Sequence, residues 1–378
     1  MTVRTASSHS PLTHLRFVPT MFTATFFQPI LRPMAALVFV FLSALASRAA
    51  ESAPVSIASE TFTSTVLRGT RTGLDPVRRI KVLLPPGYAD SDKAYPVVYF
   101  CHSIFQSPAH VLADGNLLRL VERGFASGKT PEFILVIGDY SSPTTGSLYE
   151  NSPATGRWLD YTVEELVPFI DRTYRTLRRP ESRALVGEMM GGGGALLLAM
   201  RHPDVFGIVY ALNPVRTGTG LLPVQTYPNW EKIHAAKSFA DLQGDPISQI
   251  FVTMSQAFLP NPDRPPFYCD FLMEKRDGQL VYHPENARKH VAGFALVEIA
   301  DAYAENLRRL RAIAFDWSRY DPIQDHVYGS AALSRKFDLL GVDHEAEEYR
   351  GIYWTENWRE HGRFDTRVLP FLARHLVF

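Results

Sequence analysis

Short apolar segments alternate with amphipathic segments along most of this chain. Pro96–His102 and Phe133–Ile137 are continuous apolar runs of strand length. Such runs are typical of strands that are covered on both faces in a parallel sheet. Over Tyr161–Tyr174, apolar residues recur at helical spacing on one face. The β-rich segments Thr61–Leu67 and Arg79–Leu84 come before all of these, and we expect them to form an antiparallel edge of the same sheet.

The rest of the chain repeats the order of strand and helix. The further expected strands are Arg183–Gly187, Gly207–Leu212, Ala312–Trp317 and His344–Tyr349, and the further expected helices are Val111–Arg123, Met190–Arg201, Val297–Arg311, Ser330–Leu340 and Asp365–Leu376. This alternation predicts an α/β fold, built as a doubly wound, mostly parallel sheet with right-handed crossovers and helices on both faces. Residues 215–293 break the rhythm with many prolines and aromatic residues. We interpret them as an insertion over the carboxyl ends of the strands, where such sheets bind ligands.

An uncharged apolar run, Ala35–Ala46, follows a basic residue and precedes several small residues. A signal peptide needs an apolar run of about 7–15 residues, whereas a membrane-spanning helix needs roughly 20. The sequence therefore predicts a cleaved signal peptide within residues 1–50, a mature domain over residues 51–378, and a secreted or periplasmic protein with no stable membrane anchor. The stretch before Met34 is long for such a peptide, so we expect translation to begin later, at Met21 or Met34.

Charge is balanced, with 39 Lys and Arg against 39 Asp and Glu. This balance argues against nucleic acid or an anionic membrane surface as the main partner. The histidines lack the spacing of metal ligands, and Gly191–Gly194 lacks the lysine and the serine or threonine of a phosphate-binding loop. We therefore expect no cofactor, and a small molecule such as an ester or a glycan-like compound as the ligand. The pattern leaves the oligomeric state open.

The stretch Arg183–Pro214 places a tight, glycine-rich turn between an apolar strand and a helix. This is the setting of the nucleophile elbow, G-x-S-x-G, whose strained turn needs glycines because the helix packs closely on the strand. Gly187 and Gly191 occupy the two glycine positions, so Met189 stands where the serine belongs.

Around this turn the chain resembles the esterase family that includes esterase D, antigen 85 and the feruloyl esterases. The elbow of that family reads G-H-S-M-G-G-Y-G-A-L and is followed by H-P-D-x-F. The residues that fit are Gly187, Met190, Gly191, Gly192, Gly194, Ala195, Leu196, His202, Pro203, Asp204 and Phe206. The resemblance extends over nearly everything from Arg79 to Phe378, and it implies the α/β-hydrolase fold and an ancestral activity on carboxylic esters.

The implied catalytic site departs from the family at two side chains. A serine esterase needs a hydroxyl that is activated by an imidazole, which a carboxylate orients. The resemblance places the acid at Asp321, the nucleophile at Met189 and the base at Tyr353. A thioether cannot form a hydrolysable acyl ester, and a phenol, with a reference pKa of about 10, is a poor general base near neutrality. A structural role for Asp321, in capping or in a turn, is the alternative to a catalytic one.

A substitute base is sought among the remaining histidines. His361 lies eight positions after Tyr353 and is the first candidate, with a surface histidine before the last helix as the alternative. His326 and His344 rank behind it.

The third departure concerns the oxyanion hole. The family has a glycine after the histidine that ends its strand, whereas here Ser103 follows His102. The expected donors to a developing negative charge are backbone N–H groups of Ser103, Ile104 and Met190. The Met190 N–H depends on the backbone alone, so we expect it to be kept, and we expect His102 to pack and to form hydrogen bonds.

These departures lead to three hypotheses. The first is a secreted pseudoesterase that has lost the serine and the histidine and binds a ligand in the former active-site pocket. The second is an active carboxylic-ester hydrolase with a rebuilt catalytic set, such as Ser103 or Ser107 with His361 and Asp321. The third is an interaction protein that uses the aromatic surface of the insertion.

Overall fold

The computed structural model describes residues 54–220 and 228–378, and Ser52–Phe378 forms one compact unit. The predicted signal peptide lies outside the described residues. Among the helices of the described part, none is long and apolar enough to cross a membrane.

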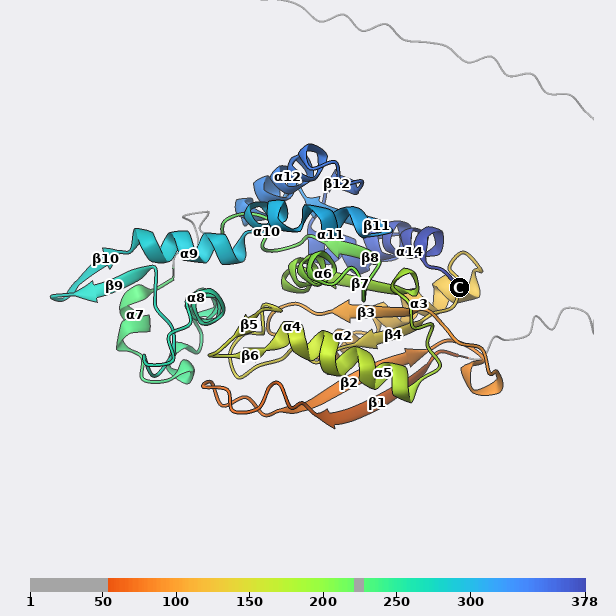
Figure 1. Ribbon diagram of the computed structural model, residues 1–378, viewed down its shortest axis with the longest axis horizontal. Helices are drawn as coiled ribbons and strands as arrows, with labels where there is room; N and C mark the ends of the chain where they lie inside the picture. The colour runs from red at the N-terminus through yellow and green to blue at the C-terminus, as the bar shows by residue number, and fades with distance from the viewer. Residues whose placement is uncertain (1–53, 221–227) are drawn as a thin grey trace, which may run out of the picture. The chain divides into compact units, whose positions relative to one another are not determined.

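A mixed sheet of eight strands forms the centre of the unit (Figure 1). In spatial order the strands are β1 (Ser56–Thr63), β2 (Val77–Leu84), β4 (Ile134–Ile137), β3 (Val97–Cys101), β7 (Arg183–Glu188), β8 (Ile208–Leu212), β11 (Ala312–Ser318) and β12 (Glu345–Tyr349). β1 and β2 are antiparallel to their neighbours, and the strands from β4 to β12 run parallel. The predicted α/β sheet with an antiparallel edge is therefore confirmed.

Helices pack on both faces of this sheet. The α-helices of the described part, including those of the insertion, are α2 (Pro108–Ala113), α3 (Asn116–Ala126), α4 (Trp158–Asp160), α5 (Val167–Thr173), α6 (Met190–Arg201), α7 (Trp230–Ala235), α8 (Pro246–Phe258), α9 (Pro284–Phe294), α10 (Leu296–Ile299), α11 (Ala304–Arg309), α12 (Gln324–Leu339), α13 (Tyr353–Trp358) and α14 (Leu369–His375). Successive residues of a strand enter different cores, because side chains alternate across a sheet. Tyr99 and Leu185 pack in the core that includes α6, whereas Phe100 and Val186 pack in the core that includes α3 and α14.

Several element boundaries differ from the sequence prediction. The first strand was expected at Thr61–Leu67 but ends at Thr63, because the Glu165 carboxylate accepts hydrogen bonds from the N–H groups of Thr65 (2.6 Å) and Val66 (3.2 Å) in place of a strand partner. The helix expected over Val111–Arg123 is divided into α2 and α3 by Gly115, whose φ of 69° is left-handed. Helix α12 begins at Gln324, six residues earlier than predicted.

The described part of the insertion contains α7, α8, a hairpin of β9 (Met273–Arg276) and β10 (Gln279–Tyr282), and α9. Figure 1 shows these elements gathered at the end of the sheet toward which β3 points. Two small apolar clusters, separate from the two large cores, hold the insertion together. The strand ends and the insertion therefore face one another, and the candidate site lies where they meet.

Candidate functional site

The turn between β7 and α6 has the strained geometry of a nucleophile elbow. Met189 occupies the turn with φ 51° and ψ −116°, outside the regions that non-glycine residues favour. A Cβ atom on Gly187 would lie 2.2 Å from the carbonyl oxygen of Gly191, and a Cβ on Gly191 would lie 1.9 Å from that of Cys101. The two glycines are needed because strand and helix approach so closely, and this supports the register that places Met189 at the nucleophile position.

The Met189 side chain is half-buried and lines a pocket. Its sulfur accepts a hydrogen bond from Nδ2 of Asn213 at 3.3 Å, and the same nitrogen donates to Oδ2 of Asp321 at 2.6 Å. Asn213 is itself held by the N–H of Ser318, which donates to its Oδ1 at 2.7 Å. One fixed amide therefore connects the nucleophile position to the acid position.

Asp321 follows β11 and is 1% exposed. Its Oδ1 accepts the N–H of Ile323 at 2.8 Å, and its Oδ2 accepts hydrogen bonds from Asn213 and from Nδ1 of His326, the latter at 2.9 Å. Burial alone would raise the pKa of the Asp321 carboxyl, but these hydrogen bonds outweigh burial and hold the pKa below its usual value. The retained acid is therefore an ionised group that orients a histidine.

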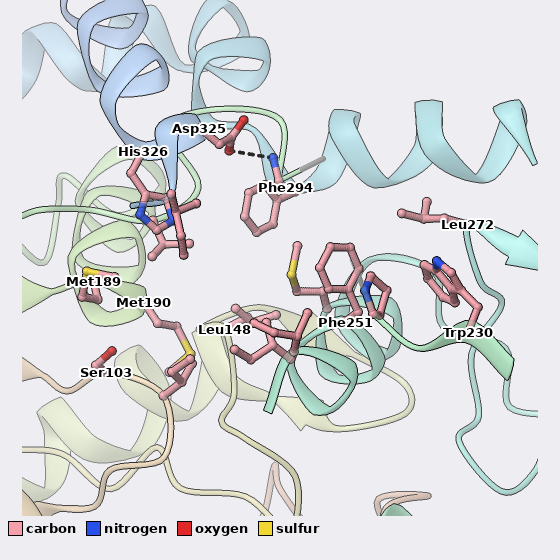
Figure 2. Close-up of a pocket in the computed structure, with 18 of the residues that line it drawn as sticks. Ser103, Leu148, Met189, Met190, Trp230, Phe251, Leu272, Phe294, Asp325 and His326 are labelled. Atoms are coloured by element: carbon pink, nitrogen blue, oxygen red, sulfur yellow. Dashed lines mark hydrogen bonds between the residues drawn. The ribbon is translucent and has the colours of Figure 1, made fainter. Parts of the chain in front are cut away.

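That histidine, His326, is the third residue of α12, is 5% exposed and lines the same pocket as Met189. In Figure 2 its ring extends from α12 toward the end of the pocket where Met189 and Met190 lie. Nδ1 is engaged by Asp321, whereas Nε2 has no hydrogen-bond partner among the described residues. Nε2 also keeps some accessible surface, and because His326 lines the pocket, this nitrogen can be reached from the pocket.

The histidine expected to substitute for the base is elsewhere. The side chain of His361 is 76% exposed, and its ring nitrogens lie 3.4 Å from the Asp365 carboxylate and 3.8 Å from that of Glu360. It does not line the pocket, so the imidazole that the structure pairs with Asp321 is His326 and not His361. The expectation that the site has lost its histidine is therefore wrong, because the imidazole of His326 lies beside Asp321.

Tyr353, at the expected base position, begins α13 and packs edge-on against Trp354. Burial, followed by the negative charges of Asp321 and Glu188, raises the pKa of its phenol to about 12. The phenol therefore stays protonated near neutrality and cannot act there as a general base.

Two backbone N–H groups of residues that line the pocket have no acceptor within the described structure. Met190 is the first residue of α6, where N–H groups have no intrahelical acceptor. The Ile104 N–H also has no acceptor among the described residues, whereas the Ser103 N–H donates to Oε1 of Gln106 at 2.8 Å. The expected oxyanion donors are thus available at Ile104 and Met190, and the one at Ser103 is occupied.

His102 has the packing and hydrogen-bonding contacts of a structural histidine. It is fully buried, its Nδ1 lies 2.9 Å from the carbonyl oxygen of Ser103, and its Nε2 accepts the N–H of Tyr140 at 3.0 Å. Since a carbonyl can only accept, Nδ1 carries the proton and the ring is neutral. Burial lowers the pKa of His102 and favours that neutral form.

Glu188 precedes Met189 and points away from the pocket into a buried network. Its carboxylate accepts hydrogen bonds from Nε1 of Trp358 at 2.9 Å and from the amides of Asn357 and Gln106, each at 3.5 Å. Burial raises the pKa of the Glu188 carboxyl, although the three hydrogen bonds oppose that shift. Glu188 therefore supports the elbow and does not act as its nucleophile.

The pocket has a volume of about 520 Å³ and mostly apolar walls. Figure 2 shows Met189, Ser103 and His326 at one end and Trp230 and Leu272 at the other. Leu148, Phe251, Met254 and Phe294 are among the residues that line it. The pocket is therefore lined by strand ends and by the insertion together.

Two buried charges hold these walls in place. Arg216 is fully buried and donates to the carbonyls of Leu148 (3.1 Å), Gly293 (2.8 Å) and Phe294 (3.1 Å), and to the Glu150 carboxylate at 3.1 Å. Asp325 accepts hydrogen bonds from the N–H groups of Thr219 and Gly220, at 3.1 and 2.9 Å. The charges are thus used within the protein, and the pocket retains a largely apolar surface.

A comparison of the sequence with profiles of known protein families identifies the family of this chain. A profile of the family described as "Putative esterase" matches residues 72–262, just over half of the chain. The chain belongs to this esterase family.

Individual relatives of the family are distant. An esterase of Mycobacterium tuberculosis is 30% identical over 129 residues, which are 32% of this chain and 26% of that protein. An endo-1,4-beta-xylanase/feruloyl esterase of Xylanibacter ruminicola is 27% identical over 135 residues, 33% of this chain and 18% of the relative. The uncharacterised YbbA protein of Bacillus subtilis is 24% identical over 149 residues, 36% of this chain and 56% of its own length. The match thus covers just over half of the YbbA protein and about a quarter or less of the other two relatives.

Solved structures agree at the level of the fold. A ferulic acid esterase superposes with a TM-score of 0.58 at 19% identity, covering 85% of this chain and 98% of that one. An S-formylglutathione hydrolase from Agrobacterium tumefaciens gives a TM-score of 0.53 at 14% identity, covering 85% and 96%. At such low identity the likeness establishes the α/β-hydrolase fold of this esterase-family protein.

Sequence reasoning ranked one residue of the site too low and did not consider another. His326 ranked behind His361, and the helix that carries it was expected to begin only at Ser330. Asn213 was not considered at all. The signal that could have found His326 is its spacing, since it follows the recognised acid, Asp321, by five residues at the start of a helix.

Proposed function

We propose that this esterase-family protein is a pseudoesterase that binds an apolar small molecule in its pocket and does not hydrolyse esters. The observation that carries the proposal is the thioether of Met189 at the strained elbow position, directly at the end of the apolar pocket. A thioether has no proton to give up and forms no hydrolysable acyl ester. In another hydrolase, loss of the nucleophile costs on the order of 10⁶ in kcat, which corresponds to roughly 8 kcal/mol of transition-state stabilisation.

The pocket supports ligand binding independently of catalysis. Its volume of about 520 Å³ falls within the usual range for small-molecule sites, and its walls combine many apolar side chains with few polar groups. The Arg216 and Asp325 contacts hold the walls in position, so the side chains of the walls lose less conformational entropy when a ligand binds. The sequence analysis expected an ester or a glycan-like compound as the ligand, and the mostly apolar walls favour an apolar small molecule over a glycan.

The test is the hydrolysis of p-nitrophenyl acyl esters by the purified wild-type protein, with short and medium acyl chains. We expect rates near the uncatalysed background, because no hydroxyl stands at the elbow. Robust wild-type turnover that is lost in the His326→Phe variant would overturn the proposal.

An active hydrolase is the second candidate, and the assembled Asp321–His326 pair is the observation that favours it. Ser103 is the hydroxyl that lines the same end of the pocket. However, no hydrogen bond joins Ser103 Oγ to His326 among the described residues, whereas a serine nucleophile works through such a bond. Ser107 instead caps α2 and contacts His110. Turnover that disappears in both Ser103→Ala and His326→Phe would support this candidate.

We also propose that the protein is exported, because the apolar run Ala35–Ala46 has the length of a signal peptide and is followed by small residues. N-terminal sequencing of protein from the medium or periplasm should find a first residue near Ser47–Glu51. Recovery of the chain only in the cytoplasm, with an intact Met1, contradicts this proposal.

A further inference from the structure

The replacement of serine by methionine leaves one polar atom of the pocket without its ordinary partner. In a serine esterase the nucleophile hydroxyl donates to Nε2 of the histidine. Here Nε2 of His326 opens onto the pocket and has no hydrogen-bond partner among the described residues, while Met189, at the elbow, has no proton to donate.

The other side of the ring decides what Nε2 can accept. Nδ1 lies 2.9 Å from a carboxylate oxygen of Asp321, which can only accept, so Nδ1 carries a proton. In the neutral ring the lone pair is then at Nε2, and Nε2 accepts a hydrogen bond. The Asp321 carboxylate is fixed by Asn213 and by the Ile323 N–H, so the ring cannot easily reverse this arrangement.

Asp325 and the Ser103 N–H, two neighbouring polar groups at this end of the pocket, are already satisfied by the protein, whereas the N–H groups of Ile104 and Met190 remain free donors in the described part of the chain. Both oxygens of Asp325 accept backbone N–H groups, and the Ser103 N–H is taken by Gln106. A ligand that enters meets mostly apolar walls, these donors, the Ser103 hydroxyl and, at His326, a ring nitrogen acceptor on a residue that is only 5% exposed. Leaving such an acceptor unpaired beneath a bound ligand weakens binding.

We propose that the pocket takes an apolar alcohol or phenol, whose hydroxyl occupies the place of the missing serine hydroxyl and donates to Nε2 of His326. This inference rests on the proposed function, since it requires a pocket that binds without cleaving. An ester or ether of the same size has no proton to donate and leaves Nε2 unsatisfied. The site therefore discriminates in favour of the hydroxyl compound and against its ester, the opposite of a hydrolase.

The experiment compares 1-naphthol with 1-methoxynaphthalene, which differ by one methyl on the oxygen, by calorimetry on the wild-type protein. We expect 1-naphthol to bind about tenfold more tightly, the value of one hydrogen bond to a buried acceptor. In the His326→Phe variant the ratio of the two affinities should fall to about one or two. The ratio that remains measures the steric effect of the methyl group alone. Tyr328→Phe removes a solvent-exposed hydroxyl from the same helix and should keep the wild-type ratio.

Met189→Ser provides a second variant that keeps Asp321 paired. Its new hydroxyl donates to Nε2 and competes with the ligand, so the preference for 1-naphthol should fall toward the His326→Phe ratio. Equal wild-type affinities for the two compounds, or a preference that persists in His326→Phe, would overturn the inference while leaving apolar binding intact. Hydrolysis of esters by the wild type, in contrast, would contradict the proposed function itself.

Discussion

Replacing the Met189 side chain by that of serine changes only the tip of an elbow whose other parts are in place. The Asp321–His326 pair is assembled, and the N–H groups of Ile104 and Met190 are available. If Tyr353 stood at the base position with no histidine nearby, as the sequence suggested, Met189→Ser would need Tyr353→His as well. With His326 already on the acid, the single substitution should be enough.

Met189→Ser should therefore raise the rate of p-nitrophenyl ester hydrolysis above that of the wild type by roughly 10²-fold or more. General-base catalysis contributes about 10²–10⁴-fold, so Met189→Ser with His326→Phe should lose most of that gain. Met189→Ser with His361→Ala is the matched control and should keep it, because the exposed His361 ring contacts Asp365 and not Asp321. Loss of the gain in the His361 variant would restore the sequence-based choice of base.

The pH dependence of stability tests whether the Glu188 carboxyl, next to the elbow, is buried. Burial raises the pKa of its carboxyl, so the folded protein keeps this proton to higher pH than the unfolded chain. The folded state therefore binds more protons in the window above the unfolded value of about 4.3, and its stability falls as the pH rises through that window.

The free energy of unfolding of the wild type should thus decline relative to that of Glu188→Gln between pH 4 and neutrality, as measured by urea denaturation. Glu305→Gln alters a side chain that is 90% exposed and is the control, with a pH profile parallel to the wild type. A Glu188→Gln profile that also runs parallel would show that the Glu188 carboxyl is not shifted by burial.

At the scale of elements, Arg216 is the link between the sheet and the insertion. Its guanidinium donates to carbonyls at the end of α9 and to the loop before β5 (Asn151–Ser152), and it lies over the ring of Phe258 at 4.9 Å. Glu150 balances the charge. Removing one partner of a buried pair leaves the other uncompensated.

Arg216→Met should lower the free energy of unfolding by about 3–5 kcal/mol, measured by urea denaturation with tryptophan fluorescence. It should also weaken ligand binding, because Leu148 and Phe294, two of the residues that Arg216 holds, line the pocket. Arg374→Met breaks an ion pair with Glu345 whose side chains are 52% and 58% exposed, and should cost about 0–1 kcal/mol. Similar stabilities for the two variants would contradict a linking role for Arg216.

Element prediction succeeded where one physical signal dominated. The strands β3, β7, β8 and β11 are buried on both faces and mostly apolar, and the close approach of Gly187 and Gly191 fixes the start of α6. The sequence therefore placed these elements within a residue or two. It failed where side chains from distant parts of the chain took over the backbone, as Glu165 does after Thr63. It also failed at the start of α12, whose first turn carries polar side chains that read as a loop.

In the whole molecule, the sequence resemblance identified the fold correctly, and the structure brings the predicted nucleophile position, Met189, and acid position, Asp321, together through Asn213. The base could not be identified in the same way. Which histidine reaches Asp321 depends on how α12 and the segment after β12 pack, and spacing along the chain does not encode that packing. The family fold has thus kept a paired imidazole and carboxylate at a pocket whose nucleophile position carries a thioether.

We propose that the wild-type site lacks a nucleophile at its elbow, while the Asp321–His326 pair and the Met190 N–H are in place. Intact-mass spectrometry after exposure to an alkyl fluorophosphonate measures this directly on the wild type and Met189→Ser side by side. We expect no adduct on the wild type and one phosphonyl adduct, located at residue 189, on Met189→Ser. An adduct on the wild type at Ser103 or any other residue of the pocket, or the absence of an adduct on folded Met189→Ser, would contradict it.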